Sequence, residues 1–305
     1  MESTDDRSTT LIDGRTIAAE WRDGLESAVT ELEAAGVSPT LATVLVADDH
    51  ASEEYMDLKH REAEAVGVRT RDVRLPPGTS PETLESRVTE LNRDPDSHGI
   101  FIQMPLPDGI DVQSLRSRID PVKDVEGLSP ENLGRLVRGS PRYLPPTPGA
   151  IEVLMGAYDI DPSGSHVVIV GRTDFVGRPL ANLLVSDRDP GNATVTVCHT
   201  RTGDLESKTS VADVLISSAG VLDLIDGTMV KPGVTVFDVG ATRVSTEDGH
   251  EYLGDVDFES VAPKASAITP FPGGVGPVTR VSLLANTIEA ASTLASVPVE
   301  KFFTG

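Results

Sequence analysis

The stretch that decides the fold is HVVIVGRTDFVGR, residues 166–178. A run of apolar, β-branched residues leads into Gly171, and Gly177 stands where a helix would begin. Such a strand, tight turn and helix start can hold the pyrophosphate of a dinucleotide, because glycine lets the backbone approach and the helix offers free N–H groups. The match to G-x-G-x-x-G is partial, since Thr173 and Val176 occupy the second and third glycine positions. By pattern alone, an ordinary strand–turn–helix connection is an equal alternative.

The next predicted strand, residues 194–198, bears on the choice of cofactor. In NAD-specific sites this strand often ends in an acid that binds the ribose hydroxyl. Here it is followed by His199-Thr200-Arg201, with no acid. Two guanidinium groups, Arg172 in the turn and Arg201 after the strand, would suit the 2′-phosphate of NADP. The sequence therefore favours NADP over NAD. The alternative role for Arg172 is a structural ion pair, and the alternative for Arg201 is a solvated arginine in a loop.

Outward from this stretch, strands and helices alternate along the chain, which predicts an α/β fold with mainly parallel sheets. The predicted strands are residues 40–47, 68–75, 99–104, 166–170, 194–198, 214–217, 235–239 and 267–268. The predicted helices are residues 16–35, 52–66, 80–92, 177–185 and 282–294, with one more after Pro148. The proline-rich stretch PRYLPPTP, residues 141–148, is the best candidate for a domain boundary.

Composition excludes several classes of function. The 305 residues include 26 Lys and Arg against 48 Asp and Glu, a net charge of −22, which argues against nucleic acid or an anionic membrane as partner. The single cysteine, Cys198, excludes an internal disulfide and a cysteine-cluster metal site. No apolar run approaches the ~20 residues of a membrane span, and the acidic start does not resemble a signal peptide. We expect a soluble, cytoplasmic protein without a metal.

The acidic excess has a second implication. Lysine occurs only at residues 59, 123, 208, 231, 264 and 301, and the remaining basic residues are arginine. Acidic composition with scarce lysine resembles proteins of salt-accumulating halophiles, whose surface charges are screened by concentrated salt. An ordinary acidic enzyme is the alternative. In both cases most of the carboxylates are solvated surface groups.

Two features of the first half could carry chemistry. Tyr55 and Lys59 are four residues apart, so they share one face of the predicted helix. A buried lysine can have a depressed pKa and act as a base, although such a pair is more often a surface lysine beside a half-buried tyrosine. Gln103 interrupts an apolar strand immediately before Pro-Leu-Pro, at the strand end where ligands of such sheets bind. A capping hydrogen bond is the alternative for this amide.

These pieces belong to a set of motifs whose order and spacing resemble one family, the bifunctional methylenetetrahydrofolate dehydrogenase/methenyltetrahydrofolate cyclohydrolases. The motifs are Tyr55-x-x-x-Lys59, GIFIQMPLP (99–107), PVKDVEG (121–127), PPTP (145–148), VGRTDFVGRP (170–179), TVTVCHTRT (194–202), DVG (238–240), GDVD (254–257) and ITPFPGGVGPVT (268–279). They extend over more than two hundred residues, which makes a chance match very improbable.

The resemblance implies two α/β lobes around a cleft, the second of them a Rossmann-type parallel sheet. Residues 1–144 would form the folate-binding catalytic domain, joined by the C-terminal helix 278–305, and residues 145–277 the NADP-binding domain. It implies a homodimer paired through the Rossmann lobes. It also implies two reactions, the NADP-dependent oxidation of methylenetetrahydrofolate and the hydrolysis of methenyltetrahydrofolate to formyltetrahydrofolate.

The resemblance further implies roles for individual residues. Lys59 matches the lysine taken as general base or proton-transfer group, Gln103 the glutamine that tunes it, and Tyr55 the tyrosine that packs on the folate. Glu126 stands where the family usually has the aspartate that holds the pterin ring. Glutamate keeps the charge but reaches one methylene further. The cofactor residues implied are Gly171, Arg172, Thr173, Gly177, His199, Thr200, Arg201, Thr147 and Gly274.

The glycine-rich loop that begins at Pro272 is the last candidate. Consecutive glycines permit positive φ and close approach of the backbone to a ligand. Gly273 and Gly276, with Pro272, are assigned to folate binding, and a tight connector into the last helix is the alternative.

Thr173 and Thr200 replace serines that are common in the family and retain a hydroxyl for phosphate. Pro146, directly before Thr147, stands where the family often has a cysteine. This replacement indicates that the cysteine is not required for the chemistry.

Two other functions compete with this one. The first is an NADP-dependent dehydrogenase of another small substrate on the same two-lobe plan, such as a shikimate-type enzyme. The second is a non-catalytic nucleotide sensor. Gln103 and the PVKDVEG segment favour folate over the first, and retention of Lys59 with Gln103 argues against the second.

Overall fold

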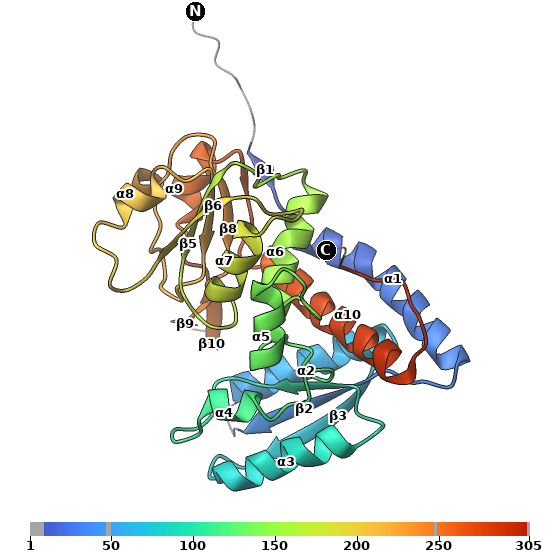
Figure 1. Ribbon diagram of the computed structural model, residues 1–305. Coiled ribbons are helices and arrows are strands. Elements are labelled where there is room, and N and C mark those ends of the chain that lie inside the picture. Colours follow the sequence, from blue (N-terminus) through green and yellow to red (C-terminus); the bar gives the residue numbers. More distant parts are fainter. Residues whose placement is uncertain (1–8, 47–49, 247–248, 304–305) are drawn as a thin grey trace, which may run out of the picture. The chain divides into compact units, whose positions relative to one another are not determined.

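A computed structural model describes residues 9–46, 50–246 and 249–303. These residues form two compact units (Figure 1). Unit 1 contains residues 150–278 and the described residues up to Ile17, and unit 2 contains residues 18–149 and those from Thr279 on. Three helices contribute residues to both units: α1 (Gly14–Ala34), α6 (Pro146–Ala157) and α10 (Val275–Ala295).

Unit 2 is built on a three-stranded parallel sheet with the order β3-β2-β4. Figure 1 labels β2 and β3 of this sheet. Its strands are β2 (Thr40–Val46), β3 (Arg69–Leu75) and β4 (Gly99–Ile102). Its other helices are α2 (His50–Ala65), α3 (Pro81–Arg93), α4 (Val112–Arg116) and α5 (Pro130–Val137).

The central strand β2 is apolar because it is covered on both faces. Alternate residues Ala42, Val44 and Val46 pack into one core cluster with apolar residues of α3 and α4. On the opposite face, the Thr43 hydroxyl lies 2.9 Å from His60 Nε2 of α2. Helices α2 and α3 therefore cover opposite faces of the sheet, which leaves the strand ends free to carry functional groups.

Unit 1 is a six-stranded parallel sheet with the order β1-β11-β8-β7-β5-β6. Its strands are β1 (Thr10–Leu11), β5 (His166–Val170), β6 (Thr194–Cys198), β7 (Val214–Ser217), β8 (Thr235–Asp238) and β11 (Ala267–Ile268). Its other helices are α7 (Gly177–Val185), α8 (Glu206–Thr209) and α9 (Phe258–Val261), with 3-10 turns at Gly227–Met229 and Ala262–Lys264. Strands β5, β7 and β8 are almost completely buried, as in a sheet covered on both faces.

The structure confirms the predicted α/β class and the parallel sheets. Besides the short helices α4, α5, α8 and α9, which were not predicted, it differs from the sequence-based assignment in three places. The start of the chain was assigned to the first domain, but β1 pairs with β11 in the sheet of unit 1. An antiparallel hairpin, β9 (Thr242–Thr246) and β10 (Gly249–Leu253), was not predicted. The last helix begins at Val275 rather than at residue 282.

Each difference has a physical reason. A two-residue strand is too short to show any hydrophobic period. The hairpin residues are mostly polar or half-exposed, so they lack the alternation of a packed strand. Gly276 and Pro277 looked like helix breakers, but they lie in the first turn of α10, where proline is tolerated because the N–H groups there have no partner in the helix.

One predicted strand extends slightly beyond the described residues. The predicted strand 40–47 ends at Ala47, which lies outside the described residues. Across the described part of the chain, none of the helices combines the length and apolar character that a bilayer crossing requires.

Candidate active site

Lys59 is the central charged group of unit 2. It lies on α2 and is only 7% exposed. Its ammonium nitrogen donates a hydrogen bond of 2.9 Å to Gln103 Oε1 and lies 3.5 Å from the centre of the Tyr55 ring. The Phe101 ring centre is 4.6 Å away. The lysine is therefore held between an amide oxygen and two aromatic rings.

Local structure explains this arrangement. Tyr55 and Lys59 are one helical turn apart and share a face of α2, as their spacing predicted. Gln103 directly follows β4, and its backbone N–H donates to Val44 O at 2.9 Å. Its side-chain nitrogen donates to Met104 O at 2.5 Å, so its oxygen is the atom left to face Lys59. The structure thus brings together the three residues that the sequence singled out in this half, and Tyr55 remains 43% exposed.

Glu126 lies on a loop that is anchored at several points. Lys123 is buried and donates to Leu91 O at 3.1 Å and to Asp94 O at 2.6 Å. The Asn286 side chain of α10 donates to Val125 O at 2.8 Å. Because the loop is held by bonds to the end of α3 and to α10, the half-buried Glu126 has a defined place in unit 2.

The buried carboxylate of Asp124 fixes the same loop to the start of α5. It accepts hydrogen bonds from Ser129 N at 2.7 Å and from Asn132 Nδ2 at 2.8 Å. None of these anchoring residues was picked out from the sequence. The only available signal was the clustering of charged residues in the segment PVKDVEG, which does not say which charges point inward.

The electrostatics of this centre favour proton transfer near neutral pH. Burial lowers the pKa of Lys59 to about 7, and Arg280 acts in the same direction, while Glu126 and Glu62 oppose the shift. Burial likewise raises the pKa of Glu126 to about 7, against the attraction of Arg116 and Lys59. A lysine with this pKa is uncharged in a substantial fraction of molecules at pH 7, so it can accept a proton.

Unit 1 contains the predicted phosphate turn. Gly171 has φ +132°, and a Cβ atom at this position would lie 2.5 Å from Ser218 O. A Cβ at Gly177 would lie 2.2 Å from Gly171 O, so the turn closes tightly on the start of α7. Thr173 accepts a hydrogen bond from Val176 N at 3.2 Å. These glycines leave a cradle without side chains at a helix N-terminus, which fits a dinucleotide pyrophosphate.

The end of β6 lies beside this turn. Gly171 N donates to Cys198 O at 2.9 Å, and β5 pairs with β6 up to Val170↔Cys198. The residues that follow are held by hydrogen bonds from His199 N to Thr202 Oγ1 at 2.8 Å and from Arg201 N to His199 Nδ1 at 3.1 Å. Arg172 and Arg201 thus follow two neighbouring strand ends.

The exposure of these side chains suits a ligand. Arg172, Thr200 and Arg201 are exposed, while His199 is half-buried. Two exposed guanidinium groups after adjacent strand ends make a local positive region on an otherwise acidic protein. This set could hold an anionic group such as a ribose phosphate.

The glycine-rich loop packs against the start of α1. Gly273 has φ +119° and accepts a hydrogen bond from Gly14 N at 3.0 Å. Arg15 donates to Pro272 O at 3.2 Å. A Cβ at Gly14 would lie 1.8 Å from Gly274 O, so position 14 must be glycine for this approach. The contact between residues 14–15 and this loop was not foreseen, because it joins segments far apart in the chain.

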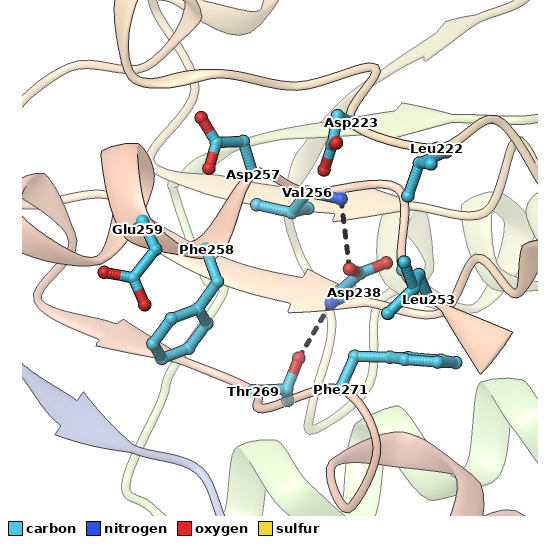
Figure 2. Close-up of a pocket in the computed structure, with 11 residues that line it drawn as sticks. Leu222, Asp223, Asp238, Leu253, Val256, Asp257, Phe258, Glu259, Thr269 and Phe271 are labelled. Atoms are coloured by element: carbon cyan, nitrogen blue, oxygen red, sulfur yellow. Dashed lines mark hydrogen bonds between the residues drawn. The ribbon is translucent and has the colours of Figure 1, made fainter. Parts of the chain in front are cut away.

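A buried pair of carboxylates in unit 1 was also missed. Asp238, at the end of β8, accepts hydrogen bonds from Asp255 N at 3.0 Å and Val256 N at 3.1 Å. Burial raises its pKa to about 7. Figure 2 shows it beside Thr269. Both residues line a pocket of about 230 Å³. Asp255 in turn accepts from Ala219 N at 2.6 Å, so it fixes the loop after β7.

The structure divides the predicted site residues between the two units. Unit 2 holds Lys59, Gln103, Tyr55, Glu126 and Thr147. Unit 1 holds Gly171, Arg172, Thr173, Gly177, His199, Thr200, Arg201, Pro272, Gly273, Gly274 and Gly276. Within unit 2 the lysine, glutamine and tyrosine are in contact, and within unit 1 the turn and the end of β6 are in contact. Thr147, half-buried on α6, lies in the other unit from the rest of the predicted cofactor residues.

Comparison with known families gives matches over both halves of the chain. Residues 12–126 match the family described as tetrahydrofolate dehydrogenase/cyclohydrolase, catalytic domain. Residues 145–295 match its NAD(P)-binding domain.

Individual relatives and solved structures agree with these matches. The chain is 51% identical to the bifunctional protein FolD of Haloquadratum walsbyi, over 96% of this chain and 94% of that protein. It is 50% identical to FolD of Halobacterium salinarum, over 95% and 99%. The FolD structure from Campylobacter jejuni, 40% identical, superposes with a TM-score of 0.89 over 94% of this chain and 99% of that one. The Trypanosoma brucei enzyme, complexed with NADP cofactor and inhibitor, is 36% identical, with a TM-score of 0.88 over 93% and 98%.

Proposed function

The chain belongs to the tetrahydrofolate dehydrogenase/cyclohydrolase family, and on that premise we propose that the Lys59 centre of unit 2 performs its hydrolytic step. The protein is a bifunctional enzyme of folate one-carbon metabolism: it oxidises methylenetetrahydrofolate with NADP and hydrolyses the methenyl product to formyltetrahydrofolate. The observation that carries the assignment of Lys59 is its burial against Gln103 and Tyr55. Family membership over both halves of the chain removes the support for a shikimate-type dehydrogenase and for a non-catalytic sensor.

In the cyclohydrolase step, water adds to the methenyl carbon of the substrate, and uncharged Lys59 accepts the proton that the water loses. The resulting tetrahedral adduct opens when its bond to the ring nitrogen breaks. The Lys59 ammonium returns the proton to that nitrogen as the bond breaks, and the hydroxyl of the adduct loses its own proton to solvent as it becomes the formyl carbonyl. The formyl group stays on the other nitrogen, and one proton is released overall. Gln103 keeps the amine in place through its hydrogen bond, and Tyr55 offers an exposed aromatic face on which the flat pterin can pack.

For the dehydrogenase step, bound NADP supplies the hydride acceptor. The chain contributes binding and alignment. We assign the pyrophosphate to the turn of Gly171, Thr173 and Gly177 at the start of α7. The 2′-phosphate is assigned to the region of Arg172, Thr200 and Arg201. We further assign His199, Thr147 and Gly274 to the cofactor, as the family resemblance implies.

Folate binding is assigned to Glu126 together with Tyr55 and Gln103, and to Pro272, Gly273 and Gly276 of the glycine-rich loop. Removing the carboxylate in Glu126→Ala should raise the KM for methylenetetrahydrofolate about tenfold, which corresponds to the loss of one charge-assisted hydrogen bond. Glu126→Asp, which restores the residue usual in the family, should keep KM within a few-fold of the original value. Steady-state kinetics of the dehydrogenase reaction measures both variants, and an unchanged KM in Glu126→Ala would remove this residue from the folate site.

The cofactor assignment predicts a change of specificity. Arg172→Ala should raise the KM for NADP by at least about tenfold and leave that for NAD nearly unchanged, because only NADP has the 2′-phosphate that pairs with the guanidinium. Arg178→Ala is the matched control, since it removes an exposed arginine from α7 without touching the turn residue. Initial rates with each cofactor measure the ratio. If Arg172→Ala changes the KM for NADP and the KM for NAD to the same extent, as Arg178→Ala is expected to do, the assignment of Arg172 to the 2′-phosphate is wrong.

The function as a whole is tested with the purified enzyme in concentrated salt, given methylenetetrahydrofolate and either NADP or NAD. Absorbance then follows the reduced cofactor and the methenyl intermediate separately. We expect both to form with NADP, and the methenyl signal to decay as it is hydrolysed. If the reduced cofactor forms and the methenyl signal does not decay afterwards, the enzyme has the dehydrogenase activity and lacks the cyclohydrolase activity.

We infer that the enzyme acts in the cytoplasm as a homodimer paired through unit 1. Support comes from the family resemblance and from the similarity to proteins of halophiles, because the acidic composition of this chain suits concentrated cytoplasmic salt. Sedimentation equilibrium in high salt measures the mass of the assembly directly.

A further inference from the structure

An ion pair lies next to the lysine of unit 2. Glu62 follows Lys59 by three residues on α2, so the two side chains project from the same side of the helix. Arg280 Nε of α10 donates a hydrogen bond of 2.6 Å to Glu62 Oε2. The guanidinium of Arg22 lies 3.7 Å from the other carboxylate oxygen.

The Glu62–Arg280 pair is shielded from solvent. The side chains of Glu62 and Arg280 are 12% and 18% exposed, whereas that of Arg22 is 36% exposed. Surface ion pairs act weakly because water and salt screen them, but screening falls with burial. The Arg280 and Glu62 charges can therefore act on a neighbouring buried group even in concentrated salt.

We propose that the Glu62–Arg280 ion pair is a positioning element of this enzyme that controls whether Lys59 carries a proton. The proposal deepens the assignment of Lys59 as the proton-transfer group of the cyclohydrolase, and its relevance to catalysis rests on that assignment. Neither residue needs to touch the substrate. Each acts through Lys59, Glu62 from the helix that carries the lysine and Arg280 from α10, which is joined to that helix by the ion pair.

The charges that face Lys59 come from each element packed around it. On α2 there are Glu62 and the uncharged ring of Tyr55, and at the end of β4 there is the amide of Gln103. The loop before α5 contributes Glu126, and α10 contributes Arg280. Two acids therefore favour the ammonium form and one arginine opposes it, so each member of the pair offsets the other.

This balance gives predictions of opposite sign. Arg280→Met removes the positive neighbour and leaves Glu62 uncompensated, so the pKa of Lys59 should rise. Glu62→Gln removes a negative neighbour and leaves Arg280 uncompensated, so the pKa should fall. The double variant removes both charges, and its pKa should return close to the original value. Arg280→Lys keeps the charge and should behave like the unmodified enzyme.

Two measurements at constant high salt test these directions. The first is the pH dependence of the cyclohydrolase kcat/KM, whose rising limb follows formation of uncharged Lys59. The second is competitive labelling of the enzyme with acetic anhydride across the same pH range, read for Lys59 by peptide mass spectrometry. The chain has only six lysines, so each can be followed separately. We expect midpoints displaced by about half a pH unit or more, upward in Arg280→Met and downward in Glu62→Gln, as for single charges near a buried group.

The outcomes separate this inference from the proposed function. Opposite displacements in the labelling curve, cancelled in the double variant, support control of Lys59 whether or not catalysis follows. If the kinetic midpoint does not follow, the role of Lys59 as proton-transfer group is wrong while the ion-pair inference stands. A purely structural pair would lower the melting temperature of both single variants and leave the labelling midpoints unmoved, which would overturn the inference. Arg280→Lys and the double variant keep the test valid should a single variant fold poorly.

Discussion

Replacing Lys59 by methionine should abolish cyclohydrolase activity and leave dehydrogenase activity measurable. Methionine fills a similar buried volume but cannot accept a proton, so the loss reports the chemistry rather than a cavity. A general base typically contributes about 10²–10⁴-fold, and we expect a decrease in that range. In the unmodified enzyme the activity should rise as pH increases through about 7, because the uncharged amine is the active form and burial lowers the pKa of Lys59 to that value.

The measurement uses purified methenyltetrahydrofolate for hydrolysis and methylenetetrahydrofolate with NADP for oxidation, each followed by absorbance. Lys301→Met provides the control, because Lys301 is an exposed lysine of the same unit. Equal losses of the two activities would indicate a folding defect. Equal retention of both would show that Lys59 does not take part in hydrolysis.

Replacing Gly171 by alanine should have the complementary effect, loss of dehydrogenase activity with cyclohydrolase retained. The new Cβ would lie 2.5 Å from Ser218 O, closer than a non-bonded carbon and oxygen can approach, and φ +132° is unfavourable for a residue with a side chain. The turn must move, and with it the free N–H groups at the start of α7. We expect NADP affinity to fall at least about 100-fold, since backbone strain and displaced phosphate contacts together cost several kcal/mol.

Gly164→Ala separates collision from backbone strain. Gly164 also has positive φ, +70°, and lies in the same unit, but a Cβ atom at this position would meet no other atom within 4 Å. Its substitution should reduce stability slightly and leave NADP binding intact. Binding is measured by calorimetric titration, and hydrolysis of added methenyltetrahydrofolate serves as the second readout. Should Gly171→Ala bind NADP as tightly as Gly164→Ala, the assignment of the turn to the cofactor would be incorrect.

Much of the fold could be predicted because its signals are local. The strands β5 to β8 are apolar runs with turn residues at their ends, and their parallel pairing follows from alternation with helices. The turn at Gly171 was recognisable since strand, glycine and helix start are adjacent in the chain. Helical spacing likewise placed Tyr55 beside Lys59.

Other parts of the site could not be predicted, because their partners are distant in the sequence. Glu62 and Arg280 form an ion pair although they are 218 residues apart in the chain, and neither was singled out in the sequence. Asp255 was visible within a motif, but its bond from Ala219 N joins two loops that are 36 residues apart in the chain. The pairing of β1 with β11 joins residues on either side of the whole central part of the chain.

Hydrophobic period, glycine placement and residue type are properties of neighbouring positions. The class of fold, the phosphate turn and the residues able to carry the chemistry could therefore be predicted from the sequence alone. Only the tertiary structure shows that Lys59 is a buried lysine with a lowered pKa rather than a surface lysine. Its burial, its hydrogen bond to Gln103 and its neighbours Glu126 and Arg280 come from four separate segments. A pKa depends on the solvent and charge around a group, and only packing of those segments sets that environment.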